Sequence, residues 1–147
     1  MGKDTSDMRI VVIGGQGGRL GQLLVEAIIK ENTGCELIAI GTNSIATSAM
    51  MKAGAMQGAT GENPVIVAAE KADVIIGPIG ILATDSLLGE ITPAMAIAIG
   101  RSNAMKFLIP LSHCNNQVVG IRQMTMAEMV RETISALNRY LSGISEK

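Results

Sequence analysis

The order of apolar and polar positions predicts strands and helices that alternate along most of the chain. A short apolar run at residues 10–13, mostly β-branched, is typical of a central parallel strand that is covered on both faces. From Leu20 onwards, apolar residues recur at helical spacing with polar residues between them. Further strands are predicted at residues 36–40, 74–77, 106–111 and 117–121. Further helices are predicted at about 44–53, at 64–71, from Thr92 and Pro93 to Gly100, and from Thr125 to Gly143, although residues 65–67 would suit a strand just as well.

These elements predict an α/β fold, namely a three-layer, Rossmann-like, doubly wound and mostly parallel sheet. Five polar residues, 112–116, separate the last two apolar runs, which indicates a hairpin and therefore an antiparallel edge strand. The glycine-rich stretch 54–62 is expected to be a connection. We expect a disordered tail at residues 1–7 and a single domain at residues 8–147, with no room for a separate substrate domain.

Glycines are concentrated directly after the first predicted strand, at Gly14, Gly15, Gly17, Gly18 and Gly21. A turn with so little side chain lets a ligand reach the backbone, and the N-terminus of the following helix favours an anion such as a phosphate. Gly15, Gly17 and Gly21 give Gly-x-Gly-x-x-x-Gly, which is one residue longer than the usual dinucleotide fingerprint. The alternative is that these glycines only allow a tight connection and close packing.

Ligands of such sheets lie outside the C-terminal ends of the strands. NAD-binding units carry an acid near the end of the second strand for the adenosine ribose, and none is present here. Thr42, Asn43 and Ser44 could instead bind a ribose or a 2′-phosphate, with Arg19 supplying charge, which favours NADP over NAD; the alternative is that Asn43 or Ser44 only caps a helix. The predicted cofactor-binding residues are Gly14, Gly15, Gln16, Gly17, Gly18, Arg19, Leu20, Thr42, Asn43, Ser44, Gly77, Pro78, Ile79 and Gly80.

His113 and Cys114 are the candidates for catalysis, because His113 is the only histidine and Cys114 follows it. Neighbouring residues of an extended chain point to opposite sides, which argues against a nucleophilic dyad, and a polar turn with a part-buried cysteine is the alternative. Asp85 and Glu90 could both face the site, although acids in loops are usually only solvated. The sequence predicts no metal site, because no cluster of histidine, cysteine and carboxylate occurs at ligand spacing.

Composition narrows the classes of partner. The net charge of −1 and the scarcity of aromatic residues, at 1%, argue against a nucleic-acid partner. No apolar run is long enough to span a membrane, and the cysteines Cys35 and Cys114 lack zinc spacing, so we expect a protein of the reducing cytoplasm. The helix at 94–99 is apolar on every side, and since one small domain rarely covers such a helix, we expect a homo-oligomer.

Several sequence blocks resemble a known family in their order along the chain. They are GGQGGRLG, IGTNSIATSAMMKAGA, GATGEN, ADVIIGPIGI, GEITPAMAIAI and LIPLSHCN. In this order they resemble the small bacterial family of uncharacterised proteins called domain of unknown function 3842, over nearly the whole chain from about Met8 to the last helix. The resemblance implies a cytoplasmic bacterial protein and transfers no catalytic residues.

Two hypotheses about function follow. The first is a binding module that holds a nucleotide or dinucleotide of the NAD(P) type through the glycine turn, as a sensor or as a subunit of a larger assembly. The second is a small NADP-type oxidoreductase whose substrate pocket is completed by another subunit. We rank binding first, because the sequence contains no paired acid and base, metal site or activated nucleophile.

Overall fold

The computed structural model describes residues 4–111 and 116–145. Its centre is a parallel five-stranded sheet in the order β3-β2-β1-β4-β5. The strands are β1 (Arg9–Gly14), β2 (Glu36–Gly41), β3 (Gln57–Thr60), β4 (Val74–Pro78) and β5 (Met105–Ile109). The helices are α1 (Arg19–Glu31), α2 (Ser44–Lys52), α3 (Glu62–Lys71), α4 (Pro93–Arg101) and α5 (Met126–Ser145), with short 3₁₀ turns η1 (Thr5–Asp7) and η2 (Ile79–Leu82).

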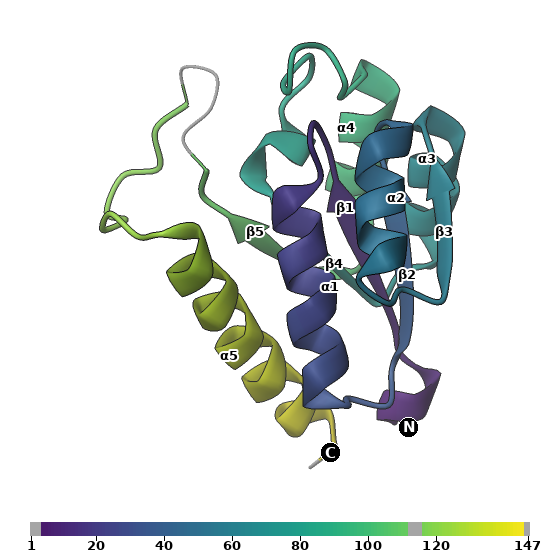
Figure 1. The fold of residues 1–147 in the computed structure, drawn as a ribbon, viewed down its shortest axis with the longest axis vertical. Coiled ribbons are helices and arrows are strands. Elements are labelled where there is room, and N and C mark those ends of the chain that lie inside the picture. Colours follow the sequence, from purple (N-terminus) through teal and green to yellow (C-terminus); the bar gives the residue numbers. More distant parts are fainter. Residues whose placement is uncertain (1–3, 112–115, 146–147) are drawn as a thin grey trace.

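The helices form one layer on each face of this sheet, as predicted for a doubly wound fold (Figure 1). In β1, Ile10 and Val12 pack in the core beneath α1, α2 and α5, whereas Val11 and Ile13 pack in the core beneath α3 and α4. All four side chains are fully buried, which confirms that the first apolar run is a strand covered on both faces. The chain builds β2 and β3 on one side of β1 and β4 and β5 on the other, so the topological switch point lies between β1 and β4.

Strand β3 was not predicted, because its sequence lies inside the glycine-rich stretch expected to be a connection. It pairs with β2 in parallel, with Ile38 opposite Gln57 and Gly41 opposite Thr60. Most of its residues are exposed, so it shows none of the hydrophobic alternation that indicates a strand. A methyl group on Gly58 would lie 2.6 Å from the Met51 sulfur, so glycine here lets α2 approach the edge of the sheet.

The predicted antiparallel edge strand at residues 117–121 is wrong. These residues form a loop with a turn, and the residues predicted to connect the hairpin, 112–115, lie outside the described part of the chain. Val119 is 90% exposed and Gly120 has a φ of +89°, so this apolar run neither packs on the core nor extends as a strand. The described sheet therefore ends at β5.

The last two helices depart from expectation in smaller ways. In α4, Met95 and Ile99 are buried but Ile97 is 50% exposed, so the helix is not covered on every side by the described chain and the homo-oligomer stays a prediction. In α5, the predicted capping box is confirmed, because Thr125 Oγ1 accepts from the Glu128 amide at 3.1 Å. Gly143 does not end this helix, which continues to Ser145.

Two further observations concern the termini and membranes. Within the N-terminal segment predicted to be disordered, the turn η1 is capped by Asp4, whose side chain accepts from the Ser6 amide at 2.8 Å. Among the residues that the structure describes, no helix is long and apolar enough to cross a bilayer.

Candidate functional site

The glycine turn connects the C-terminal end of β1 to α1 at the switch point. It closes with a hydrogen bond from the Gly18 amide to the Gly15 carbonyl at 3.0 Å. Gln16 and Gly18 have φ angles of +50° and +79°, in the left-handed region. Gly18 is the N-cap residue of α1 and, lacking a side chain, provides no capping hydrogen bond.

The structure separates the glycines that packing requires from the one that it does not. A methyl group on Gly21 would lie 2.7 Å from the Met50 sulfur, and one on Gly14 would lie 3.0 Å from the Met50 methyl carbon. At Gly18 it would lie 2.8 Å from the Ala46 Cα. Gly18 and Gly21 therefore let α1 pack closely on α2, and Gly14 lets α2 pack closely on the end of β1, whereas a methyl group on Gly17 would meet no atom within 4 Å.

The N-terminus of α1 differs from those of α2 and α4 in having no side-chain cap, which it shares with α3, where Gly61 is the N-cap residue and Glu62 stands in the first turn. α2 is capped by Asn43, whose Oδ1 accepts from the Ala46 amide at 2.8 Å, and α4 is capped by Thr92. α1 has no side-chain cap, and no acid stands in its first turn. Its first residue is instead Arg19, whose side chain is exposed. A cation at the positive end of a helix is unfavourable unless an anion binds nearby.

The C-terminal end of β2 lies beside the glycine turn and binds a carboxylate of the chain itself. Glu90 belongs to the segment between η2 and α4. It accepts hydrogen bonds from Thr42 Oγ1 at 2.6 Å, from the main-chain amide of Gln16 at 2.8 Å and from Asn43 Nδ2 at 3.0 Å. Partial burial opposes ionisation of Glu90, but these hydrogen bonds outweigh it and lower the pKa of the carboxyl group. A negative charge is therefore fixed beside the turn at neutral pH.

This arrangement changes the interpretation of the predicted ribose-binding residues. Asn43 caps α2, as the alternative interpretation held, and its amide nitrogen also donates to the Gln16 carbonyl at 2.9 Å. The Thr42 hydroxyl group donates its hydrogen bond to Glu90. Ser44 is the first residue of α2 and is exposed. The hydroxyl and amide groups expected to bind a ligand thus hold the Glu90 segment against the turn.

An open crevice lies on the other side of the glycine turn, towards β4 and β5. A small cavity of about 130 Å³ is lined by the turn, Arg19 and Leu20, and shares Pro78, Leu87 and Leu111 with a larger cavity of about 370 Å³. Most of the predicted residues at the end of β4 line the larger cavity, namely Pro78, Ile79 and Gly80. Its volume falls within the range of small-molecule sites.

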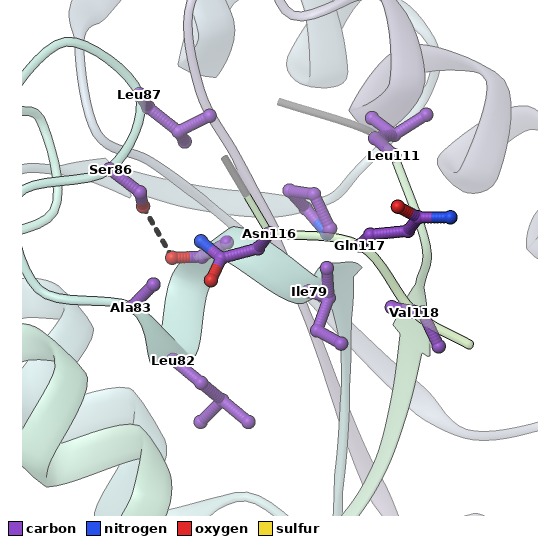
Figure 2. A pocket seen from close by; sticks show the side chains of 11 residues that line it. Ile79, Leu82, Ala83, Ser86, Leu87, Leu111, Asn116, Gln117 and Val118 are labelled. Carbon is purple, nitrogen blue, oxygen red and sulfur yellow. Dashed lines mark hydrogen bonds between the residues drawn. The ribbon is translucent and has the colours of Figure 1, made fainter. Parts of the chain in front are cut away.

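The larger cavity has apolar walls and a few polar groups (Figure 2). Ser86 donates a hydrogen bond to the Gly80 carbonyl. The amide of Asn116 is directed towards these two groups, and that of Gln117 points to the opposite side. Gly77, the residue before Pro78, does not line this cavity; a methyl group on it would be 2.8 Å from the Ile13 carbonyl oxygen, so glycine keeps β4 close to β1.

Several residues of the site were not predicted. Glu90 is one of the two acids that the sequence offered as facing the site, but its three hydrogen bonds were not predicted, and neither were Leu87, Leu111 and Asn116 as lining residues. They converge only through the fold, since Glu90 lies 48 positions from its partner Thr42. The catalytic candidates His113 and Cys114 lie outside the described residues.

Comparisons with known proteins identify the family and no function. The sequence matches the family described as Domain of unknown function (DUF3842) over residues 9–142, so the chain belongs to that family. No curated protein matches the chain.

Proposed function

We propose that this member of the DUF3842 family binds a nucleotide or a dinucleotide of the NAD(P) type through its glycine turn, as a sensor or as a subunit of a larger assembly. The observation that carries the proposal is Gly17. Packing accounts for Gly14, Gly18 and Gly21, but Gly17 has open space around it and no left-handed φ angle. Open space alone does not mark a ligand site, since Gly100 in α4 has it too, but at a turn between a strand and a helix a glycine that packing does not require is what close approach of a ligand to the backbone would favour.

The electrostatics of α1 support an anionic ligand at this turn. Its N-terminus has no side-chain cap and no acid in the first turn, so its first amide groups are available to a phosphate. Arg19 adds an exposed positive charge at the same end. A phosphate there would turn the unfavourable pairing of Arg19 with the helix dipole into a favourable three-way interaction.

The crevice towards β4 supplies space for the rest of the ligand. The cavity of about 370 Å³ adjoins the turn through Pro78, Leu87 and Leu111. Its walls are mainly apolar, with the amides of Asn116 and Gln117 and the hydroxyl of Ser86 among its lining groups. Such a surface suits a flat, uncharged ring that carries a few hydrogen-bonding groups.

The test is a thermal-shift series with the variant Gly17→Val and the matched control Gly100→Val. Both glycines have open space around them, but Gly100 lies in α4, away from the turn. The wild-type protein is heated with NAD, NADP, their reduced forms, ATP and coenzyme A. A ligand at about 100 times its Kd adds about 2.7 kcal/mol, which raises Tm by about 5–10 °C for a chain of this size.

We expect Gly100→Val to keep this shift and Gly17→Val to lose it, while the Tm of both variants without ligand stays near that of the wild type. Native mass spectrometry of the freshly purified protein gives an independent measure of any nucleotide that is carried along. If Gly17→Val keeps the full shift, the ligand does not bind at the turn. If no nucleotide shifts the wild-type protein, the proposed function is wrong.

A further inference from the structure

The segment between η2 and α4 covers the glycine turn from the side of β2. Its backbone folds back on itself, with the Asp85 amide donating to the Ile91 carbonyl at 2.7 Å. Asp85, Leu87 and Leu88 have φ angles of +67°, +56° and +57°. Residues other than glycine rarely adopt this left-handed backbone conformation, so contacts with the rest of the molecule must hold the segment in place.

Two of those contacts lie directly on the turn. Leu87 is buried, and a methyl group on Gly15 would lie 2.8 Å from its Cδ1 atom and 2.9 Å from Glu90 Oε1. The same Oε1 atom accepts from both Thr42 Oγ1 and the Gln16 amide. The space between the glycine turn and the end of β2 is therefore filled by the chain's own side chains, with a carboxylate at its centre.

This filled space coincides with one half of a dinucleotide site. In Rossmann-like domains the pyrophosphate lies at the N-terminus of the first helix and the adenosine ribose lies at the end of the second strand. In this chain that second position is taken by Glu90, whereas the described residues leave the crevice towards β4 open, with its cavity of about 370 Å³. The two sides of the turn are thus unequal.

We propose that Glu90 determines ligand specificity, because it closes the side of β2 and so makes the site prefer a mononucleotide to a dinucleotide. This inference rests on the proposed function and deepens it by naming the class of ligand. The phosphate of the mononucleotide lies at the N-terminus of α1 and its base enters the cavity beside Pro78 and Leu111. A dinucleotide binds only after Glu90 leaves Thr42, Asn43 and Gln16, and a 2′-phosphate is also repelled by its charge.

The experiment uses three probes that are chemically related. NAD consists of AMP joined to nicotinamide mononucleotide, so a dinucleotide can be compared with each of its halves. Binding is measured by isothermal titration calorimetry on the full chain. The variants are Glu90→Ala, which removes the carboxylate, and Glu90→Gln, whose amide nitrogen cannot accept the hydrogen bond from Asn43. The matched control is Asp85→Asn, which removes one charge from the same segment and keeps a residue that tolerates a left-handed φ angle.

We expect at least one mononucleotide to bind the wild-type protein about tenfold more tightly than NAD does. Glu90→Ala should strengthen NAD binding by about tenfold and change the binding of that mononucleotide by less than about twofold. Glu90→Gln should act in the same direction, and Asp85→Asn should change neither affinity.

Two results would overturn the inference and leave the proposed function standing. One is that the wild-type protein binds NAD as tightly as it binds the tighter-binding of the two mononucleotides. The other is that neither Glu90 variant has a higher affinity for NAD than the wild type. If none of the three probes binds the wild type or any variant, nucleotide binding at the turn fails, and this inference fails with it.

Discussion

Gly17 and Gly18 are adjacent, yet the structure predicts that substitution by alanine destabilises the protein at Gly18 and leaves its stability unchanged at Gly17. In Gly18→Ala, the new methyl group lies 2.8 Å from the Ala46 Cα and 3.0 Å from the Ala49 Cβ, and the residue must keep a φ of +79°. The left-handed conformation costs about 1–2 kcal/mol for alanine. Forcing a methyl group into a packed contact costs about 1–3 kcal/mol more. In Gly17→Ala, the methyl group enters open space, and we expect a change within about 0.5 kcal/mol.

Urea unfolding followed by circular dichroism measures both variants against the wild type. Gly18→Ala should lose about 2–5 kcal/mol of unfolding free energy, with a fall in Tm of about 5–20 °C. Gly17→Ala should unfold at the same urea concentration as the wild type, with the same m value. Equal losses in the two variants, or a neutral Gly18→Ala, would refute the assignment of Gly18 to the packing of α1 on α2.

Three further predictions test other features of the structure. Because hydrogen bonds lower the pKa of Glu90, its carboxylate stabilises the folded state above the ordinary glutamate pKa of about 4.3, and this effect is lost as the pH falls through the lowered value. The difference in unfolding free energy between wild type and Glu90→Gln should therefore be constant from about pH 7 to 5 and shrink as the pH falls further. A difference that does not shrink at all in acid would contradict this. Leu137 lies on α5 and is fully buried against the core, so Leu137→Ala should lose about 2–5 kcal/mol in urea unfolding, and a smaller loss would mean that α5 is not firmly packed on the sheet. Burial raises the pKa of the Cys35 thiol, so its alkylation by iodoacetamide, followed by peptide mass mapping, should reach half of its maximal rate at a higher pH than the alkylation of an exposed cysteine. A half-maximal pH below that of the exposed cysteine would contradict the burial of the thiol.

Sequence periodicity predicted the elements that bury a regular apolar pattern. Strand β1 was identifiable because all its central residues are apolar, and α5 because Val130, Ile134, Leu137 and Leu141 form one stripe. Strand β3 was not identifiable, because hydrogen bonds to β2 hold it in the sheet while its side chains remain largely exposed. The apolar run at 117–121 misled for the opposite reason, since nothing in the described chain buries it.

The candidate site was predictable in part for a similar reason. The glycine turn is a local feature of the sequence, so its position at the switch point followed from the strand before it and the helix after it. The hydrogen bonds of Glu90 are not local, because they join the segment after β4 to residues that follow β1 and β2. The local sequence does not show whether an acid in a loop is solvated or accepts hydrogen bonds from three donors. Only the fold distinguishes the two cases.

The flexible side chain of Met50 packs beneath the glycine turn. Its thioether lies against both Gly14 and Gly21, beneath the start of α1, and it is fully buried. An unbranched side chain with three rotatable bonds can change shape where a branched one would resist. Small displacements of α1, such as those that the proposed phosphate ligand would cause, can therefore be absorbed by rotation within Met50 while the sheet and α2 keep their positions.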